Sequence, residues 1–293
     1  MATTVNSHIT SIVKIINDLA CYGYGMEALF RDWCEMYALA IANSCDLIRG
    51  EEWDKREQRY KTVTSKYKKV QEDRKDGENP FTEMSAHLVE AFEIEPFNDH
   101  LGRVYMELFG GDKNLGQCFT PMPICRMMAM TNVHPVSGEV RTCADEACGG
   151  GAMLIAACEV YHNAHVNYQR WLKCYAKDLD TLCVHMCYIQ LSLIGARAEV
   201  VQGDTLAGTV NEVWYTPMEV LRLYAFPSND LGEVKPDADN TDEATEAVRD
   251  ALELETETVP DADEPADVPS GAPQKPKRNK AKQQKQLELS FFS

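Results

Sequence analysis

The residues with the clearest chemical potential are glycines and acids at the ends of three short apolar segments. They are, in chain order, Asp145 with the triplet 149–151, then Asp178 and Asp180, then Asp204. Glycine lets a backbone come close to a ligand, and a carboxylate accepts hydrogen bonds from ribose hydroxyls or an adenine amino group. Together these motifs predict a nucleoside site. Taken alone, Asp180 is better explained as a helix N-cap and Asp204 as a turn residue.

The segments around these motifs alternate between strand and helix. Strands are expected at 140–143, 173–176 and 199–202, with helices at 152–161 and 181–194 between them. This order is the first half of a doubly wound parallel sheet. Because such crossovers are right-handed, the C-terminal ends of the three strands should lie at one edge, where the three motifs meet.

The N-terminal region, residues 1–98, is predicted to be helical. Apolar residues recur at helical spacing over 9–19 and again over 26–47. The charged segment that follows carries an aromatic stripe, which we interpret as a packing seam rather than a base-stacking surface. The stripe consists of Trp53, Tyr60 and Tyr67.

Charge is unevenly distributed along the 293 residues, whose net charge is -17. Residues 229–268 hold 15 acidic and two basic residues, whereas 275–285 hold six basic residues and no acid. The apolar content of 228–285 is too low to offset the entropy of ordering, so we expect a disordered linker. The remainder is also acidic, which argues against indiscriminate nucleic-acid binding.

Cysteine and histidine usage gives no sign of a metal site. The chain has 11 cysteines and seven histidines, but no Cys-x-x-Cys pair and no His and Cys at zinc spacing. The odd cysteine number and the absence of an export signal predict reduced thiols and a cytoplasmic location. No uncharged apolar run reaches the roughly 18–20 residues of a membrane span, so no membrane association is expected.

Residues 145–154 read Asp-Glu-Ala-Cys-Gly-Gly-Gly-Ala-Met-Leu, which resembles the Asp-Pro-Ala-Cys-Gly-Ser-Gly-Gly-x-Leu motif of the adenine-specific DNA methyltransferases of the type I modification-subunit family. Residues 99–105 resemble that family's Asp-x-Leu-Gly-x-x-Tyr lead-in, and 115–121 its Gly-Gln-Phe-Phe-Thr-Pro element. Residues 203–206 match its Gly-Asp-Thr-Leu. The motifs occur in the family's order, with Glu146 in place of the usual proline.

This resemblance implies S-adenosylmethionine as cofactor and DNA as substrate. By position, Gly149 and Gly151 would line the methionine part. Asp178 would hold the ribose hydroxyls, Asp204 would meet the adenine, and Asp145 would lie near the sulfonium. The residues that would close over the cofactor are Phe119, Thr120 and Pro121.

The resemblance is weakest at the base-binding motif, Asn/Asp-Pro-Pro-Tyr/Phe, which the family carries on its fourth strand. Adenine N6 is a poor nucleophile, so its N–H groups need acceptors and the flipped base needs an aromatic partner. The sequence has no Pro-Pro, and 211–217 read Asn-Glu-Val-Trp-Tyr-Thr-Pro where the motif is due. Asn211, Tyr215 and Pro217 are therefore the candidate catalytic residues. A second interpretation is that Trp214 and Tyr215 cap the open edge of the sheet.

The last eight residues, 286–293, read Gln-Leu-Glu-Leu-Ser-Phe-Phe-Ser, which resembles the peptide that binds the bacterial sliding clamp. In that interpretation the linker is a tether, and apolar side chains fill a pocket on the clamp. The alternatives are a sticky terminus or one that folds back on the core. The candidate partner-binding residues are Gln286, Leu289, Phe291 and Phe292.

We thus predict an α/β protein in four segments. A helical region, 1–98, precedes a truncated doubly wound parallel sheet of the S-adenosylmethionine-dependent methyltransferase type at 99–227, with linker 228–285 and peptide 286–293 beyond it. The predicted function is adenine N6 methylation of DNA, with an improvised base pocket or one completed by a specificity or second methyltransferase subunit. The alternative is a non-catalytic, cofactor-binding regulator tethered to replication machinery. A small-molecule methyltransferase fits the half-site but not the family motifs.

Overall fold

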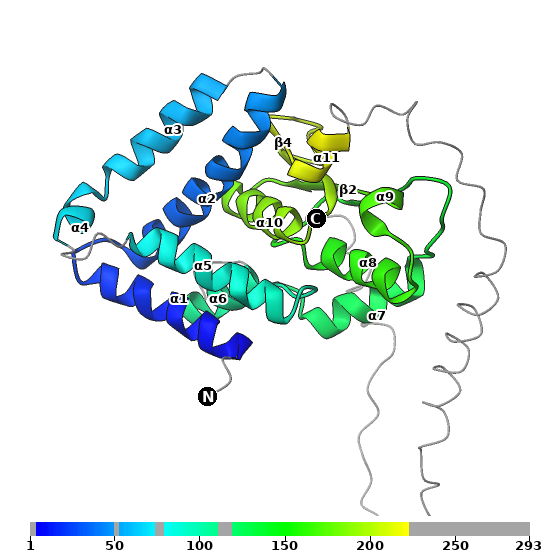
Figure 1. The fold of residues 1–293 in the computed structure, drawn as a ribbon, viewed down its shortest axis with the longest axis horizontal. Coiled ribbons are helices and arrows are strands. Elements are labelled where there is room, and N and C mark those ends of the chain that lie inside the picture. The colour runs from blue at the N-terminus through cyan, green and yellow to red at the C-terminus, as the bar shows by residue number, and fades with distance from the viewer. Residues whose placement is uncertain (1–3, 50–52, 74–78, 111–118, 223–293) are drawn as a thin grey trace, which may run out of the picture. The chain divides into compact units, whose positions relative to one another are not determined.

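The computed structural model describes residues 4–49, 53–73, 79–110 and 119–222 (Figure 1). They belong to the first of two structural units, Met1–Ala244, and the second is Thr245–Ser293. The predicted linker and the clamp-like peptide lie outside the described residues. Within the described ranges, no helix is both long and apolar enough to cross a bilayer.

The N-terminal region is helical, as predicted. Its helices are α1 (Val5–Ala20), α2 (Met26–Arg49), α3 (Trp53–Ser65), α4 (Lys68–Asp73) and α5 (Pro80–Ile94). Thr4 and Ser7 begin α1 with a capping box, in which each side chain accepts from the other residue's backbone N–H. The isoleucines of α1 and Leu19 form one buried stripe, and the helix packs mainly on α5.

The aromatic stripe on the charged segment packs inward. Tyr67 is buried, with its ring 4.8 Å from that of Phe81 and 4.9 Å from that of Tyr24. Tyr60 is half-buried against the same core. The interpretation as a packing seam is confirmed for these two tyrosines, and the side chain of Trp53 lies outside the described ones.

The three predicted strands and their two crossover helices are all present. The strands are β1 (Arg141–Asp145), β2 (Leu172–Asp178) and β3 (Arg197–Gln202), paired in parallel in that order. The crossover helices are α8 (Ala152–Asn163) and α10 (Thr181–Leu193). The C-terminal ends of the three strands therefore share one edge, which we call the carboxyl edge.

The fourth strand corrects the expectation of a parallel sheet. β4 (Glu212–Tyr215) lies outside β3 and runs antiparallel to it, with its first residue opposite Gln202 and its last opposite Glu199. A parallel crossover needs about a dozen or more residues. The connection 203–211 has only nine and holds no helix, so the chain turns directly back.

The two faces of the sheet differ in character. Because β1, β2 and β3 follow one another in chain order, right-handed crossovers place α8 and α10 on the same face. The opposite face carries half-exposed Lys173, Tyr175 and Glu199, with Lys173 Nζ 3.3 Å from Glu199 Oε2. A doubly wound sheet has crossover helices on both faces, so the described residues form only one half of that arrangement. The residues buried beneath α8 and α10 include Cys174, Ala176, Ala198 and Val200.

The helical region packs on this half-sheet. α2 packs on α10, with the two helices side by side at a crossing in Figure 1, and Arg31 Nη1 of α2 is 3.0 Å from Asp180 Oδ1, just before α10 begins. α7 packs on α8, the helix that follows β1. The remaining helices are α6 (His100–Phe109), α7 (Met122–Asn132), α9 (Tyr168–Trp171) and α11 (Pro217–Val220).

Candidate functional site

The glycine loop, residues 146–151, joins β1 to α8 and is held against the end of β2. The N–H of Cys148 donates to the Lys177 carbonyl at 3.0 Å, and the N–H of Gly149 donates to Asp178 Oδ2 at 2.9 Å. Gly149 has a φ of 50° and Gly151 a φ of 91°, a region that favours glycine. At these two positions the loop has no side chain, so its backbone can come close to a ligand.

Gly149 and Gly151 have different surroundings. A Cβ on Gly149 would lie 3.2 Å from the Phe119 ring, whereas one on Gly151 would lie 2.9 Å from Cys187 Sγ on α10. Gly149 is thus beside Phe119, and Gly151 permits close packing of the loop on α10. Thr120 and Pro121 are exposed and lead into α7.

Asp178 is the anchor of this loop. Its Oδ2 accepts from Gly149 N at 2.9 Å, and its Oδ1 accepts from Asp180 N at 2.9 Å. The side chain is half-buried at the end of β2. Each carboxylate oxygen has a second lone pair, so Asp178 can accept further hydrogen bonds from a ligand.

Asp180 serves the fold rather than facing the loop. Its Oδ1 accepts from Leu182 N at 3.0 Å and caps α10, and Arg31 donates to both of its oxygens at 3.0 and 3.3 Å. The interpretation of Asp180 as an N-cap is confirmed. The bidentate contact also joins α2 to the first turn of α10.

Asp145 and Asp178 stand at neighbouring strand ends. Asp145 is half-buried, and its Oδ1 accepts from Ala147 N at 3.2 Å. Burial raises the pKa of Asp145, the hydrogen bond from Ala147 lowers it, and the charge of Asp178 raises it further. A positively charged ligand at this edge would favour the ionised form of Asp145.

The turn after β3 also reaches the glycine loop. Asp204 Oδ1 accepts from Ala207 N at 3.0 Å, so Asp204 is a turn residue, as its local interpretation predicts. Thr205 Oγ1 donates to the Glu146 carbonyl at 2.9 Å. The structure therefore brings the three motifs together at the carboxyl edge.

The candidate catalytic residues are not brought together. Asn211 is exposed at the carboxyl edge, where its N–H donates to the Gln202 carbonyl at 2.8 Å. Tyr215 ends β4 opposite Glu199, and Pro217 begins α11 beyond it. Six residues of extended chain span about 20 Å, so Asn211 and Pro217 stand at opposite ends of the sheet.

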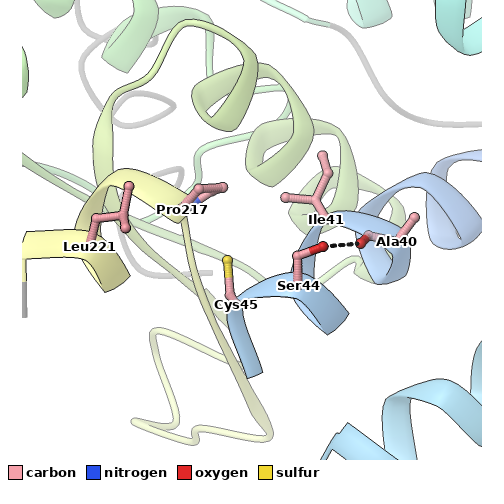
Figure 2. Close-up of a pocket in the computed structure, with 6 residues that line it drawn as sticks. All are labelled: Ala40, Ile41, Ser44, Cys45, Pro217 and Leu221. Atoms are coloured by element: carbon pink, nitrogen blue, oxygen red, sulfur yellow. Dashed lines mark hydrogen bonds between the residues drawn. The ribbon is translucent and has the colours of Figure 1, made fainter. Parts of the chain in front are cut away.

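Pro217 instead lines a cavity of about 420 Å³ between α2 and α11. Figure 2 shows Pro217 of α11 and Leu221, the residue after this helix, facing Ile41 and Cys45 of α2. The lining is mostly apolar, and the Ser44 hydroxyl is hydrogen-bonded to the Ala40 carbonyl at 3.4 Å. None of the predicted cofactor-binding residues lines this cavity.

A buried glutamine that the sequence interpretation missed binds the glycine loop on the side that faces α10. Gln190, fully buried on α10, donates from Nε2 to the Gly150 carbonyl at 2.7 Å and to Asp99 Oδ1 at 2.8 Å. Its Oε1 accepts from Leu101 N at 3.0 Å. Burial raises the pKa of Asp99, and the hydrogen bonds from Gln190 and Gly102 lower it. A glutamine within an apolar helix was the available signal, because a buried amide needs partners.

Comparison with known proteins points to a family for part of the chain. Residues 97–225 match the family model of the N-6 DNA methylases. No curated protein sequence matches the chain. The matched span contains the glycine loop, Asp178, Asp204 and the Asp99–Gln190 pair. The resemblance found in the sequence is thus confirmed for residues 97–225, which are similar to the N-6 DNA methylases.

Proposed function

We propose that the protein is a DNA methyltransferase that binds S-adenosylmethionine at the carboxyl edge and acts on adenine N6. The observation that carries this proposal is the hydrogen bond between the glycine loop and Asp178, in which Gly149 N lies 2.9 Å from Oδ2. Thr205 Oγ1, 2.9 Å from the Glu146 carbonyl, brings the third strand end to the same place. The family match supports the substrate class.

The residues at this edge fit a nucleoside that carries positive charge. Asp178 retains lone pairs for ribose hydroxyls, and Asp204 is the proposed acceptor for the adenine amino group. Burial and the charge of Asp178 raise the pKa of Asp145. A nearby sulfonium would offset the repulsion between the two carboxylates and favour the ionised form of Asp145. Gly149 and Phe119 would form the wall beside the methionine part. When bound, S-adenosylmethionine supplies an electrophilic methyl group.

The side of the site that would receive the target adenine of the DNA is incomplete within the described residues. Adenine N6 needs acceptors for its N–H groups and a ring to stack on the base. Asn211 offers one amide oxygen at the carboxyl edge, but Tyr215 and Pro217 lie toward the other end. We therefore retain Asn211 as the catalytic candidate, and we propose that a second methyltransferase or specificity subunit completes the pocket.

The exposed edge of β1 is the proposed place for that subunit. In a doubly wound sheet the second half begins beside the first strand, and the ligand crevice lies where the two halves meet. Arg141, Thr142 and Ala144 of β1 are exposed. A partner strand could pair with this edge. α7, which packs on α8, adds adaptable apolar side chains suited to an interface. The exposed ones are Ile124, Met127, Met128 and Met130.

Calorimetric titration of S-adenosylmethionine into the full chain tests the cofactor site. Asp178→Asn keeps the side-chain shape but removes the charge, so affinity should fall by about 10- to 100-fold, as for a hydrogen bond to a charged group. Asp18→Asn, an exposed acid on α1, is the matched control and should bind as the wild type does. Undiminished binding by Asp178→Asn would reject this site.

A labelled-methyl assay on DNA separates the enzyme from the alternative, a cofactor-binding regulator. The incomplete base pocket is the observation that favours the regulator. Transfer to adenine that is lost in Asn211→Ala supports the enzyme. Cofactor binding without transfer, both for the chain alone and with an added specificity or methyltransferase subunit, supports the regulator.

The terminal peptide gives a second proposed partner, the bacterial sliding clamp. The support is the sequence resemblance at Gln286, Leu289, Phe291 and Phe292, which lie outside the described residues. Deletion of 286–293 should abolish capture by immobilised clamp and leave cofactor affinity unchanged. Retained capture would show that the peptide is not the contact.

A further inference from the structure

Three side chains from two N-terminal helices converge on one point, away from the carboxyl edge. His8 Nδ1 of α1 is 3.2 Å from His87 Nδ1 of α5 and 3.0 Å from Glu90 Oε2. His87 Nδ1 is 3.2 Å from the same oxygen. The three atoms therefore form a nearly equilateral triangle.

No distribution of protons places a hydrogen bond along all three sides of this triangle. The ionised Glu90 oxygen only accepts hydrogen bonds, and each imidazole nitrogen either donates or accepts. If both nitrogens carry protons, two donors face each other. If only one does, the other nitrogen and the Glu90 oxygen are two acceptors in contact. A cation bound to all three atoms removes this conflict.

The spacing of the three atoms suits a transition-metal ion. Zn²⁺ lies about 2.0–2.2 Å from imidazole nitrogen and carboxylate oxygen, so tetrahedral ligands stand roughly 3.3 Å apart. The observed separations are 3.0 to 3.2 Å. An ion above the triangle would keep a fourth position for water. Imidazole ligands favour zinc over magnesium or calcium, which prefer oxygen.

The surrounding structure fixes the ligands and leaves an entry path. His8 is buried and stands on the packed face of α1. His87 and Glu90 are three residues apart on α5, so they share one side of that helix. The Glu90 side chain is 52% exposed. An ion can therefore reach the triangle from solvent.

We propose that His8, His87 and Glu90 bind one Zn²⁺ ion that cross-links α1 to α5. The histidines are 79 residues apart and belong to no cysteine–histidine spacing motif, which is why the sequence alone predicts no metal site. The ion would stabilise the helical region independently of the cofactor site.

The test is calorimetric titration of Zn²⁺ into the full chain, after chelation and under reducing conditions, at pH 7.5, where histidine is mostly neutral. We expect one site, and Co²⁺ in its place should give a tetrahedral absorption spectrum. His87→Ala and Glu90→Ala should each weaken binding by about 100-fold or more, since even supporting residues of metal sites contribute 10- to 100-fold.

Two variants serve as matched controls. Glu93→Ala removes an exposed acid from the same helix, and His134→Ala removes an exposed histidine elsewhere. Both should bind Zn²⁺ as the wild type does and show the same rise in Tm on binding. Equal binding by the wild type and His87→Ala would place the ion on other groups, such as cysteines, and would overturn the proposal. Absence of binding by the wild type would also overturn it.

Discussion

The two outermost strands of the sheet, β4 and β1, differ in how their outer edges are covered. On the β4 side, Arg56 of α3 donates to the Val213 carbonyl at 2.9 Å, and its guanidinium lies 4.6 Å from the Trp214 ring centre. Arg59 pairs with Glu212 at 3.0 Å. On the β1 side, Thr142 and Ala144 are exposed.

Among the residues that the structure describes, the chain itself covers the β4 edge and leaves the β1 edge exposed. Unpaired strand edges are open to pairing with other chains, and proteins usually cover or charge them. α3 covers the β4 edge with arginines that also bind acids of α2 and β4. β1 has no comparable cover among the described residues, and it is the edge at which we propose that a partner subunit binds. The variants below test this contrast, from the largest expected effect to the smallest.

Trp214→Ala should have the largest effect on the closed edge. The ring is fully buried against His185 and Tyr188. Removing such a side chain costs about 3–5 kcal/mol of unfolding free energy. Urea denaturation measures it. On the open edge, Thr142→Ala should change stability by less than about 0.5 kcal/mol. Similar losses in both variants would remove the contrast.

A fall in pH should lower the stability of the packing against β4 through His185. Burial, and to a lesser degree the charge of Arg59, lowers its pKa from 6.5 to about 3. Below about pH 6.5 the unfolded chain takes up a proton that the folded chain does not, so stability is lost as pH falls from 6.5 toward 3. The loss approaches about 1.4 kcal/mol per pH unit.

His185→Phe isolates this contribution. Within the described part of the chain, His185 Nε2 has no hydrogen-bond partner to lose. Between pH 6.5 and 5 the variant should gain about 2 kcal/mol of unfolding free energy relative to the wild type. Urea titrations across this range measure the difference. Parallel pH curves for the two proteins would mean that His185 titrates normally when folded.

The ion pairs at the two edges should show the smallest contrast. Arg59→Ala leaves Glu212 and Glu35 without their shared cation, and we expect a loss of about 1–2 kcal/mol because these groups are partly buried. Arg141 and Glu139, near the start of β1, are mostly exposed, so Arg141→Ala should cost about 0–0.5 kcal/mol. Thermal unfolding of both variants gives the comparison. An equal shift in Tm would show that α3 does not secure β4.

The local patterns of the sequence predicted most of the half-sheet. The strands near 140–143, 173–176 and 199–202 were found because short apolar runs end in glycine or acid, and those ends define the carboxyl edge. The direction of β4 was missed although the nine-residue connection already excluded a parallel crossover. That direction also decides that Asn211 and Pro217 stand apart.

Contacts between distant segments could not be predicted from local patterns. Gln190 binds Asp99 across 91 residues, and its importance depends on burial that only the folded chain creates. The triangle of His8, His87 and Glu90 depends in the same way on how α1 packs on α5. Periodicity identifies a helix and its apolar face, but it does not identify which helix that face will meet.

The packing of α2 on α10 has a consequence for the order in which the chain folds during synthesis. Arg31 and its partner Asp180 are separated by 149 residues. At roughly 5–20 residues per second, a ribosome needs about 7–30 s to make the intervening chain. During that interval the side of α2 that packs on α10 lacks its final partner. The packing of α2 is therefore completed only after α10 is made, and contacts of such long sequence separation slow folding.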